Sequence, residues 1–165
     1  MYKDPHSNRY QMWYQSYVDP KTPDKSLRCV VCYAESRDGI RWDKPDLELF
    51  PFYDIKKTNI VLVSNKQRST HYGASVVVDS SEPDSFRKYK MAYWDFVGKG
   101  GKPLKGLCVA FSPDGIHWTK YPNNPVLHGA YGERDPPPLR NPLATDTHGQ
   151  EPPLALAISD VIDAT

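Results

Sequence analysis

One carboxylate of the sequence lies where an apolar side chain would be expected. Asp160 belongs to the segment ISDVIDAT (158–165), which matches the earlier segment GASVVVD (73–79) when their serines are aligned, so that Asp160 replaces Val76. Both segments are rich in β-branched residues, which is typical of buried strands. A carboxylate on a buried strand is costly unless it is paired or lines a wet channel. Asp160 is therefore either a functional carboxylate in such a channel or a salt-bridged or exposed residue at a strand start.

A histidine and a tyrosine precede the first of these two strands. His71 and Tyr72 occur in STHYGASV, directly before residue 73. A second alignment, with an offset of 89 residues, matches His71 with Asp160 and predicts that both lie at the mouth of one channel. His71 can donate or accept a hydrogen bond there, and the ring of Tyr72 can stack on a ligand. A surface loop histidine and a tyrosine that only packs are the alternatives.

The three cysteines are Cys29, Cys32 and Cys108, and an odd number is a poor disulfide framework. The Cys-x-x-Cys spacing could indicate a metal or redox pair, but RCVVCYA reads as a strand and no second ligand pair follows. We expect reduced, structural cysteines, with Cys32 and Cys108 buried at matching strand positions. The sequence contains no metal-ligand cluster, phosphate-binding glycine loop or Ser-His-Asp arrangement, and it predicts no metal and no cofactor.

A repeat positions these residues. SRDGIRW (36–42) and SPDGIHW (112–118) are nearly identical and lie 76 residues apart, and RYQMWY (9–14) resembles KYKMAY (88–93) at an offset of 79. In the latter pair Tyr, Met and Tyr alternate, as side chains on one face of a strand do. Each copy therefore predicts two antiparallel strands, a turn at Asp-Gly and a short further strand. The segment 73–79 predicts a further strand. Because its β-branched residues form a continuous run, we expect this strand to be buried on both faces.

The Asp-Gly turn explains why the seven letters recur. Glycine accepts a positive φ at no steric cost, which makes Asp-Gly a strong hairpin signal. The carboxylates of Asp38 and Asp114 can accept backbone N–H bonds within the turn. In each copy the serine two positions earlier can brace the loop, and the tryptophan four positions later can fold back over the hairpin. The repeat is therefore expected to be structural.

Four antiparallel strands repeated radially form a β-propeller blade. The predicted fold is all-β: a partial β-propeller of about two four-stranded antiparallel blades plus the start of a third. We expect a single domain, 1–165, that begins with a blade lacking most of its inner strand (1–53) and continues with a complete blade (72–128). An inter-blade loop (129–157) and the start of the next blade (158–165) follow, and a further loop is expected at 50–71. Because a propeller closes only with about four or more blades, we expect an internal fragment, or a chain that self-associates through exposed blade edges.

Composition limits the partners. The 165 residues suit one domain, and a formal net charge of +1 argues against a general nucleic-acid binder. No apolar run approaches the ~20 residues of a membrane span, and the polar start MYKDPHSNRY predicts no secretory signal. We expect neither nucleic acid nor membrane as a partner, and the compartment stays open.

The phrases YQMWYQSY, YAESRDGIRWDKPDLELF, AFSPDGIHWTKYPNNPVL and SDVIDAT resemble the five-bladed propellers of glycoside hydrolases. The similar types are the arabinanase/xylosidase type (family 43) and the invertase/levanase type (family 32). The turn itself resembles the Asp-box of sialidases, shortened by one residue. The resemblance implies hydrolysis of glycosidic bonds by two or three carboxylates around a central channel: a first-blade Asp as base or nucleophile, a later Asp that orients or tunes, and a Glu as proton donor.

On this resemblance Asp160 is the candidate catalytic carboxylate, and the inner strand that would carry the first-blade Asp is absent from the sequence. His71 is expected to bind a sugar hydroxyl or a catalytic carboxylate, and Tyr72 to stack on a sugar ring. Arg134 and Asp135, followed by proline, match an invertase-type triplet whose carboxylate binds sugar hydroxyls, although they lie in a proline-rich loop before the third inner strand.

The resemblance thus implies a propeller that hydrolyses oligo- or polysaccharides, with carbohydrate as its partner and the fragment itself inactive. The alternative is a non-catalytic propeller that binds glycan or protein.

Overall fold

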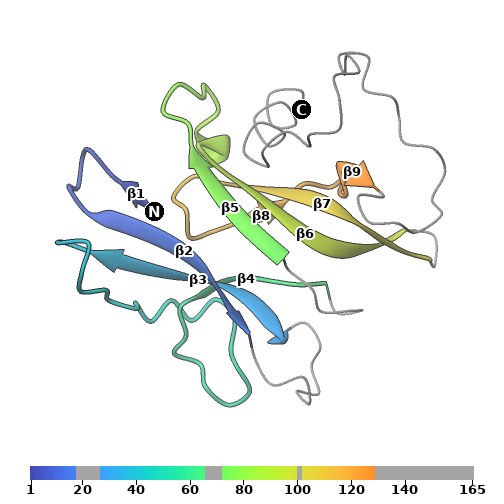
Figure 1. Ribbon diagram of the computed structural model, residues 1–165, viewed down its shortest axis with the longest axis horizontal. Coiled ribbons are helices and arrows are strands. Elements are labelled where there is room, and N and C mark those ends of the chain that lie inside the picture. The colour runs from blue at the N-terminus through green and yellow to red at the C-terminus, as the bar shows by residue number, and fades with distance from the viewer. Residues whose placement is uncertain (18–26, 66–71, 100–101, 129–165) are drawn as a thin grey trace, which may run out of the picture.

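The computed structural model describes residues 1–17, 27–65, 72–99 and 102–128. These residues form two antiparallel sheets, as expected of an all-β chain (Figure 1). The first sheet has the order β1-β2-β3-β4, and the second has the order β5-β6-β7-β8, with β9 also paired to β7. The strands are β1 (Tyr2–Lys3), β2 (Tyr10–Tyr17), β3 (Cys29–Ser36), β4 (Ile60–Val63), β5 (Tyr72–Val78), β6 (Tyr89–Lys99), β7 (Lys102–Ser112), β8 (Thr119–Lys120) and β9 (Leu127–His128), with a 3-10 helix η2 (Ser85–Arg87) between β5 and β6.

The two sheets repeat one pairing register, as the sequence repeat predicts. Met12 of β2 lies opposite Ala34 of β3, and the equivalent Met91 of β6 lies opposite Ala110 of β7. The short strand β1 pairs with β2 in the same register in which the end of β5 pairs with β6. β1 is thus the counterpart of the last two residues of β5, and the two sheets are copies of one unit.

The fourth strand of the first sheet lies beyond residue 53. It is β4, within the segment 50–71 where a loop was expected. In the second sheet the equivalent position is divided between β8 and β9, which both pair with β7. Equivalent residues of the two copies lie 76 positions apart at the turns. At the ends of the fourth strands, however, the equivalent residues Val63 and His128 lie only 65 positions apart. The first copy therefore holds 11 more residues between its turn and its fourth strand. The extra residues belong to the long loop 44–59.

The two turns close hairpins as predicted. In each copy the serine hydroxyl accepts the N–H of the turn glycine at 2.8 Å. The carboxylates of Asp38 and Asp114 each accept two backbone N–H groups of the following residues at 2.8 Å. Gly39 and Gly115 have φ of +76° and +79°, the left-handed region that favours glycine. After each turn the chain pairs antiparallel with the strand that it has just left.

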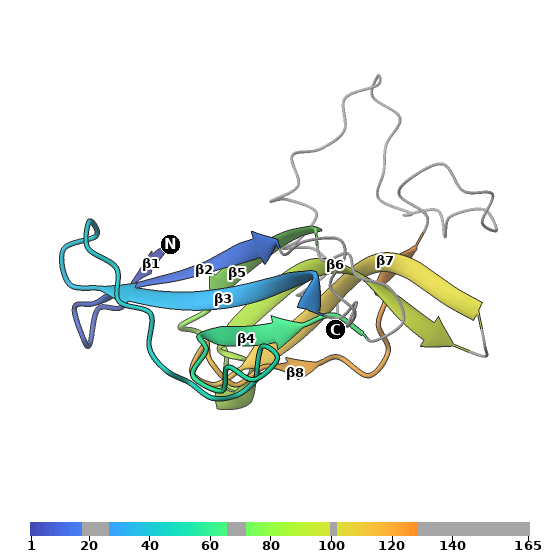
Figure 2. The same cartoon turned by 90° about the horizontal axis from the view of Figure 1, so that it is seen from below.

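The core lies between the sheets, which stack face to face (Figure 2). β2, β3 and β4 of the first sheet face β6 and β7 of the second. The buried side chains of this core are Val31, Tyr33, Val61, Leu62, Met91, Tyr93, Cys108 and Ala110. A smaller apolar cluster lies on the other face of the first sheet, where Phe50 and Phe52 of the long loop pack near Tyr14. Cys32 and Cys108 are buried and form no disulfide, which confirms their expected state.

The prediction that residues 73–79 form a strand buried on both faces was wrong in part. β5 is a strand, but its exposure alternates: Ala74 and Val76 pack against the core, whereas Gly73, Ser75 and Val77 are exposed. The reason is the position of β5 at the edge of a sheet that the first sheet covers on one face only. Among the described residues, no helix is long and apolar enough to cross a membrane.

Candidate functional site

Most of the predicted site residues lie outside the described part of the chain: His71, Arg134, Asp135 and Asp160. Tyr72 is described by its backbone alone. It is the first residue of β5 and lies opposite Trp94 of β6. The convergence of these five residues on one channel therefore stays a prediction.

The start of β5 is fixed against the first sheet. The backbone N–H of Gly73 donates to the side-chain carbonyl of Gln15 on β2 at 3.2 Å. β2 and β5 lie side by side in Figure 1, although they belong to different sheets. This bond holds the backbone next to Tyr72, which is where the sequence predicts the mouth of the channel.

A carboxylate that sequence analysis missed is fully buried at the junction of the two sheets. Asp95 of β6 accepts hydrogen bonds from its own strand and from the residues that directly follow β4. Its Oδ1 accepts the hydroxyl of Ser64 and the backbone N–H of Phe96, both at 2.8 Å. Its Oδ2 accepts the backbone N–H of Asn65 at 3.3 Å. Asp95 therefore ties the exit of β4 to β6.

Lys120 of β8 supplies the countercharge. Its Nζ lies 3.5 Å from Asp95 Oδ2 and donates to the carbonyl oxygen of Val63 at 2.8 Å and to Asn65 Oδ1 at 3.3 Å. Burial lowers the pKa of Lys120, although the nearby carboxylate opposes that shift. The neighbouring thiol of Cys108 has its pKa raised to about 12, mainly by burial and then by Asp95. Because a buried charge is stable only when it is paired, each member of this group depends on the others.

Chemically, this group suits a positioning role. Both oxygens of Asp95 are occupied by protein donors, and the side chain has no exposed surface. A general acid or base must instead reach the proton that it transfers. A sequence signal for Asp95 existed: it interrupts the apolar stretch MAYWDFV, which is the same criterion that selects Asp160. In the described ranges, no group of three His, Cys, Asp or Glu residues could hold a metal ion.

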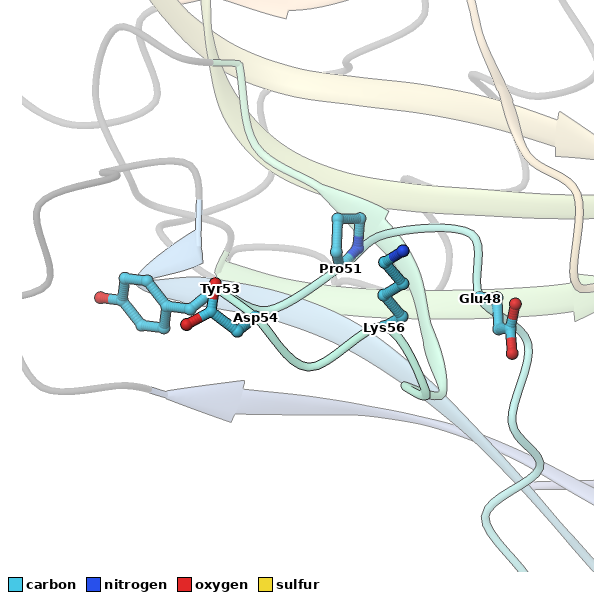
Figure 3. A pocket seen from close by; sticks show the side chains of 5 residues that line it. All are labelled: Glu48, Pro51, Tyr53, Asp54 and Lys56. Atoms are coloured by element: carbon cyan, nitrogen blue, oxygen red, sulfur yellow. The ribbon is translucent and has the colours of Figure 1, made fainter.

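A second feature is an open hollow of about 380 Å³ on the long loop 44–59. It is lined by Glu48, Pro51, Tyr53, Asp54 and Lys56 (Figure 3). The sequence analysis selected none of these residues, because no repeat or spacing marks them.

Two stacked antiparallel sheets that repeat one unit are the construction of adjacent blades in a β-propeller. No family model matches the sequence, and no curated protein does either. A solved structure does match: a variant fructofuranosidase from Schwanniomyces occidentalis, a glycoside hydrolase family 32 propeller enzyme, in complex with fructosylnystose. The TM-score is 0.51 at 19% sequence identity, over 77% of this chain and 23% of that one. This chain therefore has the fold of part of a propeller enzyme and spans about a quarter of the enzyme's length.

Proposed function

We propose that this chain forms part of a glycosidase-like β-propeller that hydrolyses glycosidic bonds in oligo- or polysaccharides. The observation that carries the proposal is the fold likeness to a fructofuranosidase over 77% of the chain. The likeness covers both copies of the repeated unit, and the sequence phrases of those copies resemble the same class of hydrolase. Carbohydrate is accordingly the proposed partner.

The proposed chemistry needs two carboxyl groups in different protonation states. One protonates the leaving oxygen, while the other, ionised, attacks the sugar or activates water. Asp160 is the proposed carboxylate of this chain, with His71 and Tyr72 at the entrance of β5 and Arg134 and Asp135 as further groups for sugar hydroxyls. Asp95 is excluded from these roles by its burial, and its part is to hold the blades in register.

The test uses the 165-residue chain and the full-length protein encoded by its reading frame. Both are assayed on aryl arabinosides, aryl xylosides and fructans. We expect background rates from the short chain, because acid and base must come from different blades. We expect turnover by the full-length protein and a kcat that is lower by about a hundredfold or more in its Asp160→Asn variant. Ser159→Ala in the same protein is the matched control, with activity retained.

Three outcomes would change the proposal. Full activity of the Asp160→Asn variant would remove Asp160 from the site. Robust turnover by the short chain would refute the need for further blades. Saturable glycan binding by the full-length protein without any turnover would favour the non-catalytic propeller.

A further inference from the structure

The long loop 44–59 is where the two copies of the repeated unit differ most. It follows the first turn and holds the 11 residues that the second copy lacks. Part of it is a cover for the first sheet, since Phe50 and Phe52 pack beside Tyr14. The remainder faces outward and encloses the open hollow of about 380 Å³. That volume lies at the lower end of the range of about 300–1,000 Å³ that small-molecule sites occupy.

An exposed aromatic ring forms one side of this hollow. Tyr53 is 51% exposed, yet its ring is braced edge-on by Phe52, with ring centroids 4.7 Å apart. Figure 3 shows Asp54 beside Tyr53 at the tip of the loop, with Lys56 and Pro51 near each other and Glu48 further away. Tyr53 and Glu48 both have positive φ, at +52° and +55°. Residues other than glycine are uncommon in that region, and such positions concentrate at functional sites.

The charged side chains that line the hollow together with Tyr53 are not paired within the described part of the chain. Within the described part of the chain, Glu48, Asp54 and Lys56 make no hydrogen bond and no ion pair. The adjacent Lys57 is different, because it pairs with Asp46 at 3.6 Å. Two carboxylates and one ammonium group therefore line the same hollow as the ring, with Asp54 beside Tyr53 and Glu48 further away (Figure 3).

These groups select the class of ligand. An anionic ligand would be repelled by two carboxylates and attracted by only one lysine. An apolar ligand would desolvate three charged groups without compensating them. A neutral polyhydroxylated ligand suits all of them: its hydroxyls donate to carboxylates and accept from the ammonium group, and its C–H face covers the ring.

We propose that the hollow formed by Glu48, Pro51, Tyr53, Asp54 and Lys56 is a carbohydrate-binding subsite with Tyr53 as its platform. The choice of a carbohydrate rests in part on the proposed function. The subsite itself binds without hydrolysis, because binding requires only the described residues of the loop.

The experiment is a titration of the ¹⁵N-labelled 165-residue chain, followed by backbone amide shifts. The probes are sucrose, a fructo-oligosaccharide, an arabino-oligosaccharide and a xylo-oligosaccharide, each tested separately. We expect saturable shifts for at least one probe, centred on residues 47–56. Tyr53→Ala should weaken that binding about tenfold, while Tyr53→Phe should stay within about twofold. Both variants keep a Cβ at the positive φ, so the backbone cost is the same and the ring alone is tested.

Phe86→Ala is the control for exposed aromatics, since Phe86 lies in η2, away from the long loop in sequence, and is 71% exposed. It should leave the titration unchanged. The proposal is overturned if no probe gives saturable shifts at 47–56, or if Tyr53→Ala binds as tightly as the original chain. The first criterion uses the unaltered chain and holds even if a variant fails to fold. If the full-length protein hydrolyses a substrate but the 165-residue chain shows no such shifts, only the subsite proposal is overturned. If the chain binds a probe but the full-length protein hydrolyses none, only the proposed activity is overturned.

Discussion

The Tyr-Met-Tyr strand motif is buried in the second copy of the unit and only partly buried in the first. Met91 and Tyr93 of β6 are 0% and 1% exposed, whereas the equivalent Met12 and Tyr14 of β2 are only partly buried. The sequences and registers match, so the neighbours must account for the difference. The motif of β6 faces the first sheet, while the motif of β2 faces the long loop 44–59. The apolar face of this unit is therefore a stacking face, and its burial depends on what lies next to it.

The two turns show the same contrast. The indole Nε1–H of Trp13, on the first sheet, donates to the carbonyl oxygen of Gly115 at 2.6 Å, and that of Trp118 donates to the same oxygen at 3.0 Å. A Cβ added to Gly115 would lie 2.6 Å from Trp13, but one added to Gly39 would find nothing nearer than Tyr10 at 3.7 Å. The first turn only closes a hairpin, whereas the second also forms part of the interface between the sheets.

The largest expected effect comes from the ionic group at that interface. Asp95→Ala leaves Lys120 without its carboxylate and removes an acceptor of the Ser64 hydroxyl that lies at 2.8 Å, nearer than the carbonyl oxygen of Asn65 at 3.2 Å. We expect a loss of about 3 kcal/mol or more in the free energy of unfolding, because breaking one partner of a buried pair leaves the other uncompensated. Ser16 occupies the equivalent position of β2, and Ser16→Ala should cost well under 1 kcal/mol. Denaturant unfolding of both variants measures the difference, and equal losses would contradict this account.

The glycine pair gives the next effect. Gly39→Ala must adopt a positive φ, which costs about 1 kcal/mol. Gly115→Ala has the same cost and also drives a methyl group into Trp13, so we expect about 2–4 kcal/mol in total. Unfolding midpoints of the two variants, with equal denaturant slopes, provide the comparison. If Gly115→Ala were as mild as Gly39→Ala, the second turn would not be packed between the sheets.

The sequence predicts what is local and repeated, and it misses what stacking creates. The strands, the register and both turns follow from alternating Tyr-Met-Tyr residues and from Asp-Gly chemistry. The half-exposure of β5 does not follow, because β-branched composition cannot show which face of a strand has a neighbour. Asp95 and Lys120 were missed because they meet only when two sheets dock. The hollow around Tyr53 was missed because the insertion that forms it matches nothing else in the chain.

The two copies should also differ in how their stability depends on acid pH, with a smaller effect than the substitutions above. In the second copy, Lys90 is paired with Asp79 at 3.0 Å and with Glu82 at 2.9 Å, whereas the first copy has the neutral Gln11 at the position of Lys90. The hydrogen bond from Ser81, and then that from Lys90, lowers the pKa of Asp79 to about 2. A lowered folded-state pKa contributes stability above the ordinary value of 3.8, and that stability is lost as the pH falls toward 2.

Lys90 itself stays charged throughout that range. Burial lowers the pKa of Lys90, but the bonds to Glu82 and Asp79 outweigh burial and raise it above its ordinary value of 10.5, so its contribution is lost only in strong alkali. As the pH falls from 5 to 2, the amide shifts around Asp79 should therefore move after those around Asp4, its counterpart in the first copy, because the hydrogen bonds from Ser7 and His6 lower the pKa of Asp4 less strongly. Asp79→Asn should remove the late transition near pH 2, and titration of Asp79 together with or before Asp4 would contradict the assignment.

The smallest expected difference concerns two equivalent thiols. Burial raises the pKa of Cys32, and it raises that of Cys108 to about 12. Since the thiolate is the reactive form, both should react far more slowly in the native chain than after unfolding. Cys108 lies between the sheets and Cys32 lies under the loop, so Cys32 should react first. Thiol labelling at pH 8, read by mass spectrometry of peptides, gives the order; rapid labelling of both would contradict their burial.

The central claim is that the first sheet covers the second turn, and exchange of the tryptophan indole N–H protons tests it most directly. The indole N–H groups of Trp13 and Trp118 both donate to Gly115, while that of Trp42, after the first turn, has no acceptor among the described residues. Hydrogen–deuterium exchange followed by NMR should therefore show slow exchange for Trp13 and Trp118 and fast exchange for Trp42. If Trp13 exchanged as fast as Trp42, the two sheets would not be docked through the second turn.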